Sequence, residues 1–167
     1  MLYSHASELA IRAALFLALQ SPGKLTPVHE IAQRTRLPRP YLAKLLRQLA
    51  AAGLVRAFRG PGGGVELGRA PEAVTLWAIV RAIEGPEESD RCVLGLHECR
   101  DEERCPLHNQ WRPLRAAMHR LLQQTTLAAL ARRLRETGED RSPFPAPPRR
   151  ERQPSVASVA KASRSYP

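Results

Sequence analysis

All three cysteines of the chain, Cys92, Cys99 and Cys105, lie in one short, charged stretch of the sequence. The residues between them include Arg, Asp, Glu and Gly, which favour a surface loop over a buried core. An odd cysteine count, without a signal-peptide pattern at the N-terminus, argues against a disulfide framework. Thiolates are the ligands that zinc, copper(I) and iron–sulfur clusters select. The stretch therefore predicts a soft-metal site and leaves the metal open.

Two histidines accompany the thiols, and His108 follows Cys105 by three residues. Three thiolates with one imidazole also form a good tetrahedral zinc site, so structural zinc is an alternative. His108 could instead only cap or hydrate the start of the helix that follows. The stretch contains no Cys-x-x-Cys pair, and only His97 and His108 could act as bases near the thiols. We therefore do not expect an enzyme.

The formal net charge of +10 is unevenly distributed along the chain. No acidic residue stands between Glu30 and Glu66, while seven basic residues do. These are Arg34, Arg36, Arg39, Lys44, Arg47, Arg56 and Arg59. A basic block of this kind suits a polyanion such as double-stranded DNA, although a solvated surface could have the same composition.

The hydrophobic spacing around this block predicts three helices and a hairpin. The first helix is expected over residues 7–20. The second should begin at Pro27, with Thr26 as its N-cap. The third is expected over 41–52 and should end at Gly53 in the left-handed conformation. Strand-like runs at 54–58 and 65–67 flank a glycine-rich loop, residues 59–64. The order predicts a mainly α fold with a small β-wing, a winged helix-turn-helix. The expected DNA contacts are Arg39, Tyr41, Lys44 and Arg47 on the third helix and Arg59, Gly62 and Gly63 at the wing tip.

The C-terminal half predicts a helix over 74–83 and then one long helix. Its apolar positions, Leu107, Trp111, Leu114, Met118, Leu121, Thr125 and Ala128, form a heptad seam. Such a helix needs a partner, so we expect a homodimer; packing back on its own domain is the alternative. Because an interior proline costs ~3 kcal/mol, Pro113 requires the helix to begin shortly before it.

The expected organisation is a DNA-binding domain (1–84), a cysteine-rich loop (85–108), a dimerisation helix (109–136) and a disordered basic tail (137–167). No apolar run approaches the ~20 residues of a membrane span, so no membrane association is expected. We expect a cytoplasmic protein, in a compartment where thiols stay reduced.

Several motifs give the chain a family likeness over residues 7–134: Pro40-Tyr-Leu, Gly53-Leu-Val, Arg59-Gly-Pro-Gly-Gly-Gly64, Ile83-Glu-Gly85 and the cysteine loop with Cys105-Pro-Leu-His108 and Trp111-Arg112. With them the chain resembles the Rrf-two family of winged-helix transcriptional regulators, the IscR/NsrR type. Ala43 departs from the likeness, because an IscR-type regulator has a base-reading acid there.

The resemblance implies a homodimeric regulator, a repressor or an activator, whose operator binding is controlled by an iron–sulfur cluster. That cluster would sense redox state, nitric oxide or cluster supply. Cys92, Cys99 and Cys105 would be its ligands, with His108 as the fourth and a two-iron cluster favoured over a four-iron one. Glu8 is the alternative fourth ligand, supplied across the dimer. The alternative function is a winged-helix DNA-binding regulator with structural zinc or no metal.

Overall fold

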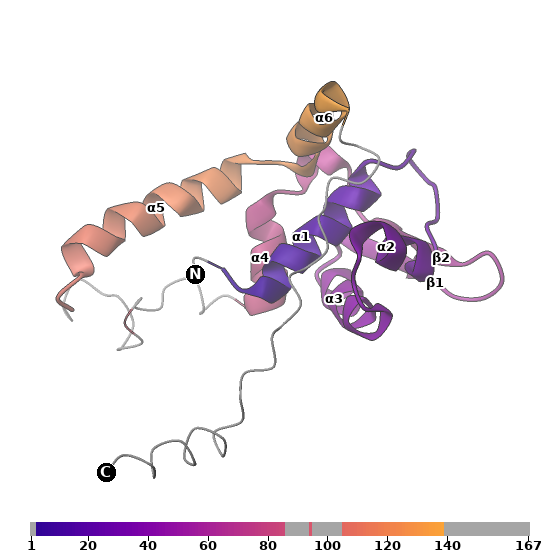
Figure 1. The fold of residues 1–167 in the computed structure, drawn as a ribbon, viewed down its shortest axis with the longest axis horizontal. Helices are drawn as coiled ribbons and strands as arrows, with labels where there is room; N and C mark the ends of the chain where they lie inside the picture. The colour runs from indigo at the N-terminus through magenta and orange to yellow at the C-terminus, as the bar shows by residue number, and fades with distance from the viewer. Residues whose placement is uncertain (1–2, 86–93, 95–104, 139–167) are drawn as a thin grey trace, which may run out of the picture.

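The computed structural model describes residues 3–85, 94 and 105–138. Cys92, Cys99 and the basic tail beyond Gly138 therefore lie outside the described residues. The elements are α1 (His5–Ala18), α2 (Val28–Thr35), α3 (Arg39–Ala51), β1 (Val55–Phe58), β2 (Gly64–Leu67), the 3₁₀ turn η1 (Pro71–Ala73), α4 (Leu76–Glu84), α5 (His108–Gln124) and α6 (Leu127–Thr137). This order matches the predicted mainly α fold with a two-stranded wing (Figure 1).

Helix α1 is the centre of the hydrophobic core. Ser4 caps its N-terminus by accepting a hydrogen bond from the Ser7 amide, and eight of the nine side chains that α1 buries are apolar. It contacts α2, α3, α4 and α6. Because small residues such as Ala10 and Ala13 are fully buried, neighbouring helices can approach the α1 backbone closely. Leu and Ala side chains fill most of this core, as the low aromatic content requires.

Helices α2 and α3 form the helix-turn-helix. Arg36 ends α2 in the left-handed region, at φ 55°, although it is not glycine. The Leu37 amide then donates to the Ala32 carbonyl at 2.9 Å, which closes the turn. Pro40 occupies the first turn of α3, where a missing amide donor costs nothing. Helix α3 buries Leu42, Leu45, Leu46 and Leu49, one apolar stripe at helical spacing.

The predicted capping role of Thr26 is wrong. Pro27 is the N-cap of α2, and it makes no side-chain cap bond. Thr26 is instead fully buried and pairs with Val65 of the wing through two backbone hydrogen bonds of 2.9 and 2.8 Å. Thr26, two residues before α2, therefore serves as a third strand position beside the hairpin.

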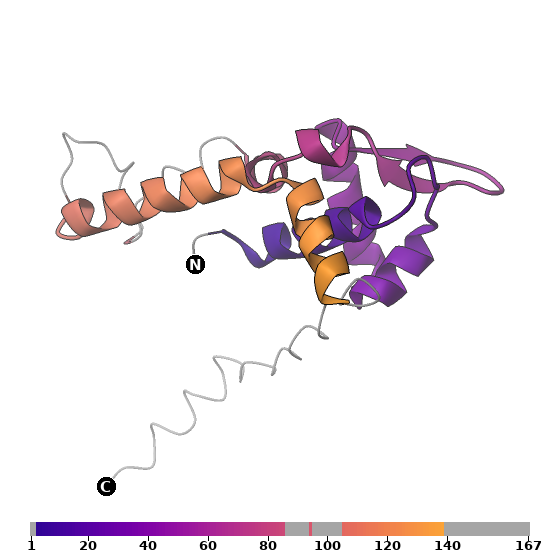
Figure 2. The ribbon, with the colours of Figure 1, turned by 90° about the horizontal axis from the view of Figure 1, so that it is seen from above.

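Strands β1 and β2 form the antiparallel wing, with Phe58 opposite Gly64 at the tip end. Gly62 has φ +77°, which favours glycine. A Cβ on Gly63 would lie 2.4 Å from the Phe58 carbonyl oxygen, so no side chain fits there. Both views show the hairpin projecting at the opposite end of the molecule from α5 (Figures 1 and 2).

The single long helix predicted over 109–136 is also wrong, because the chain breaks between α5 and α6. Thr125 is extended, and Thr126 caps α6 through a bond from the Ala129 amide. The break allows α6 to turn back and bury Leu127 and Ala131 against the core, which is the alternative considered for the predicted helix. Helix α5 extends away from the body (Figure 2).

A short backbone bridge holds this break in place. Leu76 donates to the Thr125 carbonyl at 3.0 Å, and Leu127 donates to the Val74 carbonyl at 2.9 Å. The two threonines at the bridge, Thr75 and Thr126, each cap a helix, α4 and α6. Across the described segments, we find no helix with the length and apolarity of a membrane span.

Candidate nucleic-acid interface and metal centre

The predicted DNA contacts of α3 lie on its outer face. Arg39 is the first residue of the helix, Lys44 and Arg47 are exposed, and Tyr41 is half-buried beside them. Tyr41, Lys44 and Arg47 follow each other at three-residue steps, so they share one side of the helix. None of the carboxylates in the described part of the chain forms a salt bridge with Arg39, Lys44 or Arg47. Their charge is therefore available to a polyanion.

The wing adds a second basic point to the same surface. Arg59 is exposed at the end of β1, next to the turn in which the Gly63 amide donates to the Gly60 carbonyl at 2.9 Å. Arg56 also belongs to the basic block, but it pairs with Glu66 across the hairpin at 2.9 Å. Arg56 thus has an acidic partner within the wing, whereas Arg59 has none among the described residues.

Two of the predicted metal ligands fall within the described residues and lie in one turn of the chain. The His108 amide donates to the Cys105 carbonyl at 3.0 Å, directly before α5 begins. His108 is buried with 4% exposure, and Cys105 is half-buried. No group of three metal-ligating side chains forms among the described residues, and Cys92 and Cys99 are not among them.

The surroundings of His108 fit a metal centre. Trp111, on the next turn of α5, has a buried indole nitrogen without a hydrogen-bond partner in the described structure. Buried donors are nearly always paired, and an exception calls for an explanation such as an ion or cofactor. A thiol and an imidazole at the start of one helix are suitable ligands for a thiolate-rich metal group, and an N–H donor nearby can hydrogen-bond to such a ligand.

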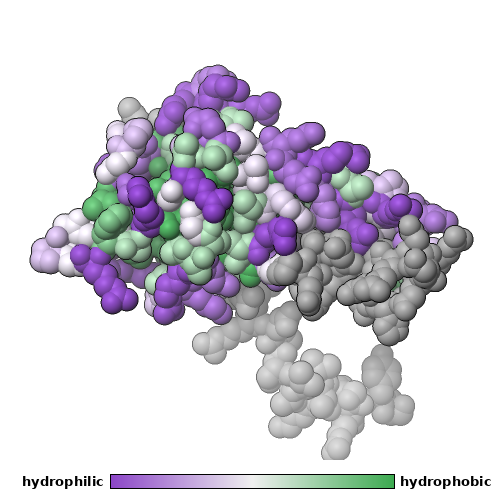
Figure 3. Space-filling view, turned by 180° about the vertical axis from the view of Figure 1, so that it is seen from behind, coloured by the Kyte–Doolittle hydropathy of each residue, from purple (hydrophilic) through white to green (hydrophobic). Residues whose placement is uncertain are grey.

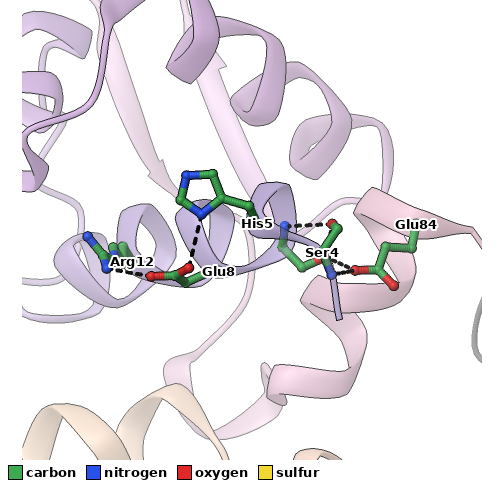
Figure 4. Close-up of polar contacts among 6 residues, drawn as sticks. Ser4, His5, Glu8, Arg12 and Glu84 are labelled. Carbon is green, nitrogen blue, oxygen red and sulfur yellow. Dashed lines mark hydrogen bonds and ion pairs between the residues drawn. The ribbon is translucent and has the colours of Figure 1, made fainter. Parts of the chain in front are cut away.

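Glu8, the alternative fourth ligand, is already engaged within its own chain. Its carboxylate pairs with Arg12 one turn along α1 and accepts from His5 Nδ1 at 3.0 Å (Figure 4). The hydrogen bond from His5 lowers the pKa of the Glu8 carboxyl, Arg12 adds to the lowering, and partial burial opposes it. Each of the two Glu8 carboxylate oxygens therefore already has a hydrogen-bond partner within this chain.

A carboxylate that sequence reasoning left without a role joins the cysteine loop to α1. Glu84 Oε1 accepts from the Ser4 amide at 2.6 Å and from the Ser7 hydroxyl at 2.5 Å (Figure 4). Glu84 is the last residue of α4, and Gly85 follows at φ +86°. The motif Ile83-Glu-Gly85 therefore fixes the N-terminus of α1 at the point where the chain enters the cysteine loop.

Helix α5 carries an apolar stripe that is exposed in the described part of the structure. Leu114 and Leu121 are 61% and 62% exposed, at heptad spacing on the predicted seam. On the opposite side, the His119 ring packs against Trp77 of α4, with ring centroids 4.5 Å apart and ring planes tilted by 46°. The arm formed by α5 is otherwise mostly hydrophilic (Figure 3). Two exposed leucines on a projecting helix are typical of a contact with a second helix.

Comparison with known proteins is consistent with these features. A family model described as Rrf2, iron-dependent transcriptional regulator, matches residues 3–133. The chain is 36% identical to the HTH-type transcriptional regulator IscR of Erwinia tasmaniensis over 121 residues, which cover 72% of this chain and 73% of the relative.

Solved structures of two regulators, CymR and IscR, also match this chain. CymR, the global cysteine regulator of B. subtilis, matches with TM-score 0.65 and 32% identity, covering 78% of this chain and 95% of CymR. IscR of T. potens matches with TM-score 0.66 and 26% identity, covering 80% of this chain and 88% of that protein.

Proposed function

Because this chain belongs to the Rrf2 family of DNA-binding transcriptional regulators, we propose that it is an iron–sulfur-dependent one. It binds its operator as a homodimer, and a cluster on Cys92, Cys99, Cys105 and His108 controls the affinity. The observation that carries this proposal is the pairing of Cys105 with a buried His108 in one turn at the start of α5. The family description, an iron-dependent regulator, agrees with it.

The chain's own residues supply a route from the metal site to DNA. The cysteine loop is bounded by Glu84 and by His108, and Glu84 holds the N-terminus of α1. Helix α1 contacts α3, whose outer face carries the proposed DNA contacts. When bound, the cluster supplies a group whose charge and integrity respond to oxidants and nitric oxide. A change in the loop can thus reach α3 through α1.

The choice of His108 as fourth ligand rests on its position, because His108 shares a turn with Cys105. Glu8 lies in α1, where its carboxylate pairs with Arg12 and His5. A neutral imidazole in place of a thiolate raises the reduction potential of a cluster. It also makes ligand binding sensitive to protons, because only the neutral ring binds metal.

The test is anaerobic purification followed by visible spectra and analysis for iron, acid-labile sulfide and zinc. We expect a brown protein with equal iron and sulfide, which loses its colour after exposure to nitric oxide or oxygen. We expect His108→Ala to lose or alter the cluster and Glu8→Ala to keep it. A colourless protein with stoichiometric zinc would replace the proposal by the structural-zinc regulator.

The same two variants, His108→Ala and Glu8→Ala, distinguish His108 from Glu8 as the fourth ligand. A His108→Ala protein with normal cluster content and potential, beside a colourless Glu8→Ala protein, would transfer the role to the carboxylate supplied across the dimer. Glu72→Ala is the matched control, because Glu72 is an exposed carboxylate on η1, outside both α1 and the cysteine loop.

A further inference from the structure

Trp111 carries a hydrogen-bond donor that has no partner in the described part of the structure. Its Nε1 atom is buried and has no hydrogen-bond partner among the described residues. The Thr26 hydroxyl is the one other described side-chain group in this state. A buried donor left without a partner costs about 1–3 kcal/mol. Thr26 is at the base of the wing, where its backbone pairs with Val65. Trp111 is beside the proposed ligands.

The position of Trp111 follows from the helix start. The Trp111 amide donates to the Leu107 carbonyl at 2.8 Å, so the residue is already within regular α5. His108 and Trp111 are three residues apart and therefore share one helix face. Cys105 is tied to His108 by the backbone bond of 3.0 Å. A thiol, a buried imidazole and a buried indole N–H thus lie within seven consecutive residues at the start of α5.

We propose that the Trp111 indole N–H donates a hydrogen bond to a sulfur atom of the metal centre, either a cysteine thiolate or a bridging sulfide. This assignment rests on the proposed function and adds a residue that tunes the site without binding metal. Hydrogen bonds to cluster sulfurs stabilise the more negative, reduced form. Trp111 therefore raises the reduction potential and sets the range of redox conditions to which the regulator responds.

The other tryptophan provides a matched control. Trp77 is half-buried on α4, and its ring packs at a tilt against His119 of α5. Its indole nitrogen is not among the buried atoms without a partner in the described residues. Replacing it with Phe removes an indole near the same helix without removing the proposed donor. Both variants delete one indole N–H, so they differ only in which site loses it.

The experiment loads wild type, Trp111→Phe and Trp77→Phe anaerobically with ferrous iron and sulfide, and measures each reduction potential by spectroelectrochemistry. We expect Trp111→Phe to be about tenfold less reduced than wild type at a fixed potential, a negative shift of about 59 mV for a one-electron couple. Trp77→Phe should match wild type. Thermal unfolding of the cluster-free proteins shows whether each variant folds normally.

If Trp111→Phe takes up no cluster, the same measurement is made with β-(3-benzothienyl)alanine at position 111. This residue keeps the shape of the indole ring and replaces its N–H with sulfur. A loaded variant with the wild-type potential would overturn the assignment and leave the proposed function intact. Failure of both variants to load would also overturn it, since Trp111 would then be needed for assembly. A wild-type protein that takes up no cluster would overturn the proposed function and this assignment together.

Discussion

Arg59 is exposed at the tip end of the wing, and it has no acidic partner among the described residues. Replacing it with alanine should weaken operator binding by about 1–3 kcal/mol if it reads a base or a narrow groove. The measurement is operator affinity by fluorescence anisotropy at physiological salt. Arg133→Ala, an exposed residue of α6, is the control and should leave the affinity unchanged. An Arg59→Ala protein with wild-type affinity would remove the wing tip from the interface.

Individual residues also show where sequence reasoning was sufficient. Gly53 was predicted to end the third helix in the left-handed region, and its φ of +67° confirms this. Thr26 could not be placed correctly, because a threonine before a helix satisfies the capping pattern whether or not it pairs with a strand far along the chain. The role of Glu84 was equally hidden, since its partners, Ser4 and Ser7, are nearly eighty positions away.

At the scale of elements, α5 is the candidate dimerisation helix. Replacing Leu114 and Leu121 with Asp puts two charges on its exposed apolar stripe, where burial without partners is strongly unfavourable. Because both side chains are more than half exposed, the monomer should keep its stability. We expect monomers in sedimentation velocity, with poor operator affinity. A variant that still sediments as a dimer would place the interface elsewhere.

The heptad pattern located this stripe but not the end of the helix. Apolar periodicity continues through Thr125 and Ala128, so it gives no sign of a break. The available signal was chemical: Thr126 precedes a new apolar run, Leu127 to Leu130, in the position of an N-cap. Whether the helix continues or breaks depends on whether burying Leu127 in the core is more favourable than extending the apolar seam. That balance is decided by tertiary contacts, which cannot be read from the spacing of apolar residues.

At the scale of the whole molecule, Glu84 links the cysteine loop with the DNA-binding body. Replacing it with alanine leaves the Ser4 amide without its acceptor and removes the longer-range partner of the buried Ser7 hydroxyl, so stability should fall by about 1–3 kcal/mol. The variant should also show a smaller difference in operator affinity between its cluster-loaded and cluster-free forms. Urea unfolding and anisotropy titrations of both forms measure the two effects.

Glu72→Ala, on the exposed η1 turn, should change neither quantity. If Glu84→Ala loses stability but keeps the full affinity difference, the contact with α1 is structural only. The coupling must then run through another path, such as the packing of α4 directly on α3.

The backbone bridge between Thr75 and Thr126 has a consequence for the operator itself. The 17 residues of α5 extend about 25 Å from this joint, so a rotation of about 10° there would carry the far end through about 4 Å. In a dimer paired along α5, the same angle determines how far apart the two recognition helices stand. Half-sites of such dimers are about 34 Å apart, one helical turn of DNA. In such a dimer we expect the accepted half-site spacing to depend on the angle at this joint, which two backbone hydrogen bonds hold in place.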